Sequence, residues 1–326
     1  MNVCLTKVDV DLLSDAAALN GVTEWLRAKI ASLLVNIPLD NTLNGSQRHN
    51  VADIFRDTAT SLEWIDLYQS QKLMLRALYF RPDGPFLKKK VQEYGRYIDA
   101  AESGECEVKG IYLSFPKHPP SPLLQSLVEG SYEHKEAELL TRFIEPDDRV
   151  LELGAGIGFM GVTAMMRCNP ASYTAFEANP ALLPFIAKNM QHNDVVFNVK
   201  NAVLLDKPGL QAFYVTPAFW GSSLLQPAEG YFEQVEVPAL EKNSVIAELA
   251  PTTLIVDIEG GEAAFFRELD LTSVRKIIVE IHPMILGDDE IIEIFNTLIS
   301  QGFLLDFKAS GKQELFWCRS DSKVNI

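Results

Sequence analysis

The sequence has few cysteines and no long hydrophobic run, and both absences restrict the class of protein. The four cysteines of the 326-residue chain are scattered and form no C-x-x-C pair. We therefore expect neither structural disulfides nor a cysteine-based zinc site. No apolar stretch reaches the roughly 18 residues that a membrane helix needs. Asp9 and Asp11 interrupt what would be the apolar core of a secretory signal. These features predict a cytoplasmic protein without a membrane partner.

Positive charge is also scarce. The chain has 44 acidic residues against 29 Lys and Arg, which gives a net charge of −15. Residues 1–100 contain 12 of each sign, so 44 − 12 = 32 acidic residues face 29 − 12 = 17 basic ones in the rest of the chain. A surface of that charge repels phosphate backbones. The composition therefore predicts no nucleic-acid partner.

The pattern of residues divides the chain into three parts. Residues 1–104 read as helices joined by polar loops, with a loop expected over residues 37–50. The expected helices cover residues 21–37, 60–80 and 86–104. Four prolines within residues 116–122 indicate a linker or an arm, which we place at residues 105–130. Residues 131–326 then alternate between strand and helix patterns and form the third part.

The helical part has no motif that fixes its role. A lid, a homodimerisation module and a substrate-recognition domain all remain open. The stretch DTATSLEWIDLYQS has a faint similarity to the phosphopantetheine attachment segment of acyl carrier proteins, with Ser61 at the attachment position. Thr60 replaces the usual aspartate and the region lacks a carrier's acidity, so we do not expect a carrier role.

The third part predicts an α/β fold. Apolar strands are expected at RVLEL, YTAFEA, VVFNVKNAVL, TTLIVDIEGGE and KIIVEIHP, and FLLDFKASGKQELFWC reads as a closing hairpin. Apolar strands that alternate with helices form a parallel sheet covered on both faces. We therefore expect a Rossmann-like, doubly wound, mostly parallel seven-stranded sheet with a C-terminal antiparallel hairpin.

The stretch VLELGAGIGFMG, residues 150–161, contains two overlapping glycine patterns. Gly154, Gly156 and Gly158 form G-x-G-x-G, which is common where the ligand is S-adenosylmethionine. Gly156, Gly158 and Gly161 form G-x-G-x-x-G, the fingerprint of a dinucleotide-binding turn. In both cases glycines allow a tight turn, and the next helix presents its amide N–H groups to the ligand.

Two acids bear on the choice of cofactor. Glu177 lies 21 residues after Gly156 at the end of the second strand, where an acid holds ribose hydroxyls of either ligand. Glu152 lies beside the turn, where a carboxylate attracts the cationic S-adenosylmethionine and repels a pyrophosphate. The closing hairpin is also unusual for a dinucleotide domain. We therefore favour S-adenosylmethionine over a nicotinamide cofactor and over a turn that binds nothing.

Several motifs together resemble the FkbM-type methyltransferases, class I enzymes that use S-adenosylmethionine, mostly to methylate hydroxyls of sugars and secondary metabolites. The motifs are VLELGAGIGFMG, AFEANP, NAVL, GSSL, LIVDIEGGE and KIIVEIHP, and the resemblance covers roughly residues 130–318. Glu152 and Gly156 depart from the family's usual aspartate and asparagine.

The resemblance implies positions for the cofactor. Gly154, Gly156 and Gly158 would line its methionine part. Glu177 would hold the ribose. The adenine would lie beside Asn201 and Ala202, and the amino-acid end beside Tyr132 and Glu133.

Candidate catalytic residues follow from strand geometry. Side chains alternate along a strand, so Asp257 and Glu259 share one face, as do Glu280 and His282. Both pairs end strands of the sheet, where open α/β sheets bind ligands. We expect His282 or Glu259 to act as the base, Glu280 to orient His282, and Asp257 to contact the cofactor or the acceptor. The same four residues form an alternative divalent-metal site, although we expect no metal.

Residues of two further segments have more than one interpretation. Glu262 either joins this site or only stabilises the start of a helix. In FWGSSLL, we expect Trp220, Ser222 and Ser223 to wall the acceptor pocket, although Trp220 fits ordinary packing equally well.

The sequence as a whole predicts an S-adenosylmethionine-dependent methyltransferase that acts on a hydroxyl of a small-molecule acceptor in a biosynthetic reaction. An N-methyltransferase and a non-catalytic S-adenosylmethionine-binding module are the alternatives, with a nicotinamide-dependent oxidoreductase behind them.

Overall fold

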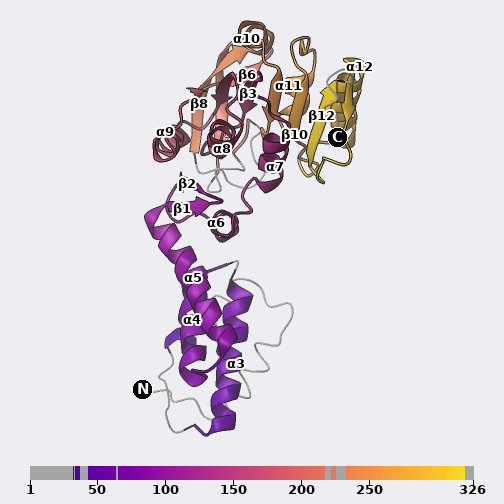
Figure 1. The fold of residues 1–326 in the computed structure, drawn as a ribbon. Coiled ribbons are helices and arrows are strands. Elements are labelled where there is room, and N and C mark those ends of the chain that lie inside the picture. Colours follow the sequence, from indigo (N-terminus) through magenta and orange to yellow (C-terminus); the bar gives the residue numbers. More distant parts are fainter. Residues whose placement is uncertain are drawn as a thin grey trace. The chain divides into compact units, whose positions relative to one another are not determined.

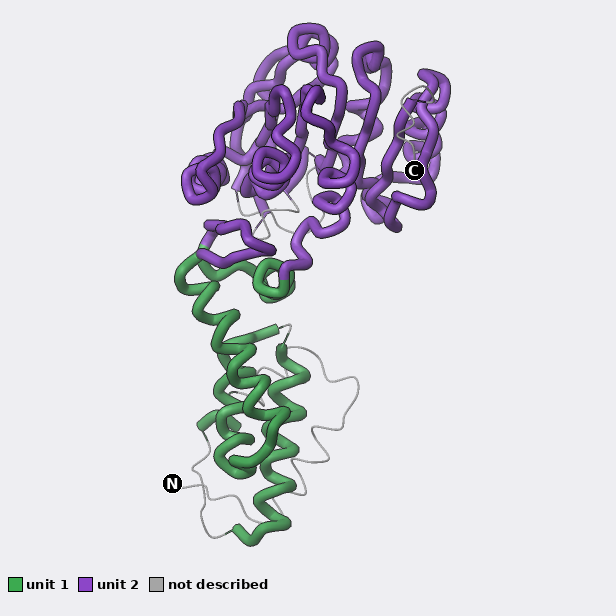
Figure 2. The backbone as a smooth tube through the Cα atoms, viewed as in Figure 1, with its two compact units in different colours: residues 1–104, 117–129 green, residues 105–116, 130–326 purple. Residues whose placement is uncertain are grey.

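The computed structural model describes residues 32, 34–36, 43–63, 65–216, 222–224 and 233–319. The chain forms two compact units (Figure 2). Unit 1 comprises Met1–Gly104 and Lys117–Glu129, and unit 2 comprises Glu105–Pro116 and Gly130–Ile326. The stretch expected to be an arm, residues 105–130, is thus divided between the two units.

Unit 1 is helical in the residues that the structure describes. Its helices are α3 (Gly45–Leu62), α4 (Leu67–Phe80), α5 (Pro85–Ser103) and α6 (Ser121–Glu129) (Figure 1). Helix α5 ends where the sequence predicts, at Gly104, whose φ of 70° suits glycine. The expected first helix, residues 21–37, lies largely outside the described residues.

Two predictions for unit 1 were wrong. Residues 37–50 are not all loop, because Asn44 and Gln47 form a reciprocal capping box that starts α3 at Gly45. Residues 60–80 are not one helix, because the side chain of Asp66 accepts the amide of Gln69 and starts α4 anew. Ser61 lies in the last turn of α3, where its hydroxyl donates to the carbonyl of Thr58.

A hairpin that the sequence analysis did not anticipate opens unit 2. It consists of β1 (Glu105–Val108) and β2 (Ile111–Ser114), which pair antiparallel. The side-chain amides of Asn189 and Asn193 bond to the backbone of β2 at Ser114 and Tyr112. These bonds satisfy backbone groups of an edge strand.

The main sheet has seven strands in the order β11-β12-β10-β9-β3-β4-β5. Its members are β3 (Arg149–Leu153), β4 (Ser172–Phe176), β5 (Asn198–Lys200), β9 (Thr253–Val256), β10 (Lys276–Glu280), β11 (Phe303–Leu305) and β12 (Glu314–Arg319). Strands β5, β4, β3, β9 and β10 are parallel, and β12 is antiparallel to both neighbours. The sheet is therefore mixed, and the expected closing hairpin is β11–β12.

Helices connect the strands in two groups. The helices are α7 (His134–Phe143), α8 (Phe159–Arg167), the 3₁₀ turn η1 (Pro180–Leu182), α9 (Leu183–His192), α10 (Lys242–Leu249), α11 (Glu262–Phe266) and α12 (Asp288–Ser300). Helix α8 contacts α7 and α9, whereas α11 contacts α12. Because parallel crossovers are right-handed, the reversal of strand order at β3 puts the two groups on opposite faces. Among the described residues, the helices are all too short or too polar to cross a membrane.

The expected third strand, VVFNVKNAVL, is not continuous. It divides into β5 and β6 (Val203–Leu205), and β6 joins β7 (Gly209–Val215) and β8 (Glu233–Glu241) in a separate sheet of order β6-β8-β7. The division falls at Asn201, whose side-chain amide donates to the carbonyls of Glu177 and Ala178. Helix α10, which the sequence analysis missed, follows β8.

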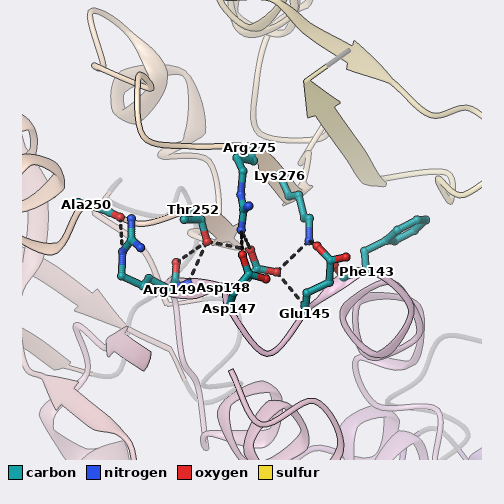
Figure 3. Close-up of polar contacts among 9 residues, drawn as sticks. All are labelled: Phe143, Glu145, Asp147, Asp148, Arg149, Ala250, Thr252, Arg275 and Lys276. Atoms are coloured by element: carbon teal, nitrogen blue, oxygen red, sulfur yellow. Dashed lines mark hydrogen bonds and ion pairs between the residues drawn. The ribbon is translucent and has the colours of Figure 1, made fainter. Parts of the chain in front are cut away.

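A buried ionic network ties together the strand ends opposite the site described below (Figure 3). Asp148, just before β3, is fully buried, and its carboxylate lies 2.9 Å from both Lys276 Nζ and an Arg275 nitrogen. The hydroxyl of Thr252, just before β9, donates to Asp148 at 2.8 Å. Burial raises the pKa of Asp148. Hydrogen bonds from the Glu145 amide, Lys276 and Thr252 lower it by more than burial raises it, so the pKa lies below its ordinary value.

Candidate functional site

A cavity of about 260 Å³ opens at the carboxyl ends of the central strands of unit 2. This is the edge at which open α/β sheets bind ligands. Its wall includes Tyr132, Glu133, Leu153, Gly154, Gly156, Phe176, Glu177, Leu182, Ala202, Val203, Leu204, Leu205, Phe213, Ser222, Leu224, Asp257, Ile258, Glu259, Arg267 and Glu290. The glycine turn, the end of β4 and the end of β9 thus meet in one hollow.

Glycine is required at position 154 by both conformation and space. Its φ is 88°, and a Cβ there would lie 1.7 Å from the carbonyl oxygen of Asp257. Gly156, with a φ of 53°, comes near the hydroxyl of Tyr132, 3.3 Å from where a Cβ would lie. The two glycines therefore let the turn approach Asp257 at the end of β9 and Tyr132 in the cavity wall.

Gly158 and Gly161 serve packing. Neither lines the cavity. Gly158 is the N-cap of α8 with a φ of 82°, and Gly161 faces the ring of Phe197, 2.5 Å from where a Cβ would lie. Gly161, the third glycine of the G-x-G-x-x-G pattern, therefore allows α8 to pack closely against Phe197 and does not form part of a phosphate site.

Glu177 reaches the cavity from the end of β4. Its side chain is buried, and its two oxygens accept the amides of Gly156 and Asn179, both at 2.7 Å. Burial raises its pKa to about 7, against the opposing effect of these amide hydrogen bonds. Each carboxylate oxygen can accept a second hydrogen bond. The residue is thus held by the glycine turn and still has capacity for a ligand.

Glu152 and Asn201 do not reach the cavity wall. Glu152 is 2% exposed, and burial raises the pKa of its carboxyl to about 8. Strand β3 is covered on both faces, and Leu153 and Gly154 are the residues that face the hollow. Asn201 acts through the backbone of Glu177, while its neighbour Ala202 lines the cavity.

Tyr132 and Glu133 precede α7 and lie at the cavity wall. Glu133 adopts a left-handed backbone conformation with a φ of 43°. Burial raises the pKa of the Glu133 carboxyl, and repulsion from Glu136 and Asp257 raises it further. A hydrogen bond with Tyr132 acts in the opposite direction. The structure therefore brings this sequence-predicted pair to the site.

An acid–histidine cluster adjoins the cavity, and we define it as Asp257, Glu259, Glu262, Glu280 and His282. His282 Nδ1 lies 2.9 Å from Glu262 Oε1. Its Nε2 lies 3.3 Å from Glu259 Oε2, 3.6 Å from Asp257 Oδ1 and 3.9 Å from Glu280 Oε1. The three predicted catalytic carboxylates therefore meet around the imidazole of the fourth predicted residue, His282.

Charge perturbs the pKa values within this cluster. Burial lowers the pKa of His282, but its bond to Glu262 and the charges of Glu259 and Asp257 raise it to about 9 overall. Burial raises the pKa of Asp257 and that of Glu259. Burial and repulsion from the neighbouring Glu136 carboxylate raise the pKa of Glu280 to about 8. Displaced pKa values beside a cavity are typical of functional sites.

The serines predicted to wall an acceptor pocket have different positions. Ser222 lines the cavity, and its hydroxyl accepts the amide of Thr216 at 3.1 Å. The Ser223 hydroxyl donates to the carbonyl of Glu259 at 2.9 Å and so fixes the backbone there. Glu259 has a φ of 50°, which is uncommon outside glycine. Trp220 lies outside the described residues.

Sequence reasoning missed part of the site. Phe176, Phe213 and the segment Val203–Leu205 supply much of the apolar wall. Their apolar character gave no signal that distinguished them from core residues. Glu262, which had two interpretations, is fully buried and bonds to His282, and also accepts the amide of Gly260.

A family model described as the methyltransferase FkbM domain matches residues 152–305. The matched range includes the glycine turn, Glu177 and the whole acid–histidine cluster. The comparison with curated proteins finds no match.

Solved structures give distant similarities. TYW2 of M. jannaschii, in complex with AdoMet, is 11% identical over 65% of this chain and 82% of that one, with a TM-score of 0.33. Sp1610 of Streptococcus pneumoniae, in complex with S-adenosyl-L-methionine, is 15% identical over 59% and 75%, with a TM-score of 0.36. The ribosomal protein L11 methylase of Lactobacillus delbrueckii subsp. bulgaricus is 13% identical over 58% and 77%, with a TM-score of 0.35. The family match, rather than these similarities, bears on function.

Proposed function

Since the matched domain is of the FkbM type and the protein is an S-adenosylmethionine-dependent methyltransferase, we propose that it methylates a hydroxyl group of a small molecule. A sugar or a secondary-metabolite scaffold is the class of acceptor. The observation that carries the proposal is the meeting of the glycine turn, Glu177 and the carboxylates after β9 in one cavity.

The cofactor would occupy the side of the cavity formed by the glycine turn. Glu177 has lone pairs available for the ribose hydroxyls, and Ala202 offers an apolar surface for the adenine. Tyr132 and Glu133 lie where the amino-acid end would extend, near Gly156. The cofactor's ammonium group would favour the ionised form of Glu133, whose pKa is raised by burial in the unliganded protein.

The acceptor would lie beside the end of β9. Methyl transfer from a sulfonium is an in-line displacement, so most of the enzyme's contribution is to position the acceptor oxygen. A hydroxyl must also lose its proton, and a positioned base contributes about 10²–10⁴-fold. Of the residues expected to act as base, Glu259 lines the cavity whereas His282 does not. We therefore assign the proton to Glu259 and a supporting role to His282.

The test uses the full chain with S-adenosylmethionine labelled with ¹³C at the methyl group. A panel of sugars, phenols, alcohols and amines is incubated with it, and the products are read by NMR. Label on oxygen supports the proposal. Label on nitrogen alone would establish an N-methyltransferase, and binding of S-adenosylhomocysteine without turnover on any acceptor class would favour the non-catalytic module.

A further inference from the structure

Three potential ligand atoms converge within the acid–histidine cluster. Asp257, Glu259 and His282 each offer one ligand atom, and these three atoms all lie within 4.8 Å of one another. Two carboxylate oxygens and one imidazole nitrogen form a donor set that suits a divalent transition-metal ion. The atoms come from the ends of two neighbouring strands, β9 and β10, whose parallel pairing fixes their separation.

A second observation concerns the orientation of the imidazole. Glu262, whose side chain has no exposed surface, holds His282 Nδ1 at 2.9 Å. This bond turns Nε2 toward Asp257 and Glu259. A carboxylate on the far nitrogen of a histidine is the usual means by which proteins orient a metal ligand.

Two carboxylate oxygens of the cluster lack a hydrogen-bond partner among the described residues. Asp257 Oδ1 is shielded from solvent and accepts no hydrogen bond from the described residues, since its 3.6 Å contact with His282 exceeds hydrogen-bond length. The fully buried Glu262 likewise has an unpartnered Oε2 among those residues. No Lys or Arg forms an ion pair with the cluster in the described part of the chain. His282, when protonated, is the charge that pairs with these carboxylates in the described part of the chain, and a metal ion on Nε2 would take the place of that proton.

We propose that Asp257, Glu259 and His282 bind a divalent transition-metal ion such as Mn²⁺, with Glu262 as the positioning residue. The proposal rests on the proposed function and deepens it, because a metal at the end of β9 would lie beside the acceptor. A bound metal acts as a Lewis acid that lowers the pKa of a coordinated hydroxyl. Glu259 would bind the ion with one carboxylate oxygen and would keep the other to accept the hydroxyl proton, since a carboxylate has two acceptor atoms.

The experiment is an equilibrium titration of the full chain with Mn²⁺, with free Mn²⁺ read by electron paramagnetic resonance. We expect one ion per chain. His282→Gln removes a ligand, and we expect Mn²⁺ affinity to fall at least tenfold. Glu262→Gln keeps the shape but weakens the orienting bond, and we expect a loss of about 10–100-fold.

The matched control is Glu314→Gln. Glu314 belongs to a neighbouring group of three acids with Glu136 and Glu280 and contributes no atom to the proposed site. Its variant should keep the wild-type Mn²⁺ affinity. Equal loss in Glu314→Gln and His282→Gln would overturn the assignment, as would absence of stoichiometric binding to the wild type.

Calorimetry with S-adenosylhomocysteine separates the two proposals. His282 is not part of the cavity wall, so His282→Gln should bind S-adenosylhomocysteine as the wild type does, and this also reports on folding. Wild-type protein that binds S-adenosylhomocysteine but not Mn²⁺ would refute the metal site alone. Failure to bind S-adenosylhomocysteine would refute the proposed function itself.

Discussion

Replacement of Gly154 by alanine tests the geometry that joins the glycine turn to the end of β9. Gly154 has a φ of 88°, and an L-residue in left-handed conformation costs about 1–2 kcal/mol. The added Cβ would lie 1.7 Å from Asp257 O, a backbone atom that no side-chain rotation can move. Overpacking of this kind costs about 1–3 kcal/mol. The Asp257 amide, which donates to Leu153 O at 3.0 Å, would be displaced as well, at a cost of about 1 kcal/mol.

These contributions sum to about 3–6 kcal/mol. A domain of this size loses roughly 2–4 °C in melting temperature per kcal/mol, so Gly154→Ala should lower the melting temperature by at least about 6 °C. Because Gly154 and Asp257 both line the cavity, affinity for S-adenosylhomocysteine should also fall more than about tenfold, which is 1.4 kcal/mol.

Gly110→Ala is the matched control. Gly110 has a φ of 83°, but a Cβ there would contact nothing within 4 Å. It therefore carries the conformational cost alone, about 1–2 kcal/mol, and should leave S-adenosylhomocysteine binding unchanged. Thermal unfolding and calorimetry of both variants give the comparison. Equal melting temperatures and equal affinities in the two variants would refute the close approach of the turn to Asp257.

Three further predictions concern separate carboxylates. Glu259→Gln should lower kcat by about 10²–10⁴-fold with less than tenfold change in S-adenosylhomocysteine affinity, and steady-state kinetics that show an unchanged kcat would remove Glu259 as the base. Burial raises the pKa of Glu177 to about 7. If the ionised carboxylate holds the ribose, affinity should rise as pH increases through 7 and then level off. Glu177→Gln should abolish that rise and weaken binding by about 1.5–3 kcal/mol, as calorimetry across pH would show. Asp148→Asn leaves the buried Lys276 without its buried partner and should cost about 3–5 kcal/mol in urea unfolding. The folded-state pKa of Asp148 is depressed, so its contribution is complete above the unfolded value of about 4 and is lost as pH falls through the folded value. A variant that matches wild-type stability at pH 7 would contradict that role.

The sequence predicts the central sheet well because its strands are short apolar runs bounded by strong signals. Strands β3, β4, β9 and β10 lie where their apolar residues indicate, and Gly104 ends α5 as expected. The convergence of Asp257, Glu259, Glu280 and His282 also follows from two adjacent parallel strands that end at the same edge.

Other features depend on contacts between distant segments. Glu152 lies on β3, whose two faces are both covered, so the apolar pattern does not show which residues face the cavity. The division between β5 and β6 depends on bonds of Asn201 to the end of β4. Glu262 follows a glycine pair as a helix-starting acid would, and only its contact with His282, 20 residues later, reveals its second role.

The most direct test of the account is calorimetric titration of the full chain with S-adenosylhomocysteine, NAD⁺ and NADP⁺. We predict micromolar binding of S-adenosylhomocysteine, about −8 kcal/mol, and no binding of either nicotinamide cofactor. Binding of NAD⁺ or NADP⁺ in its place would contradict the assignment of the cavity to S-adenosylmethionine.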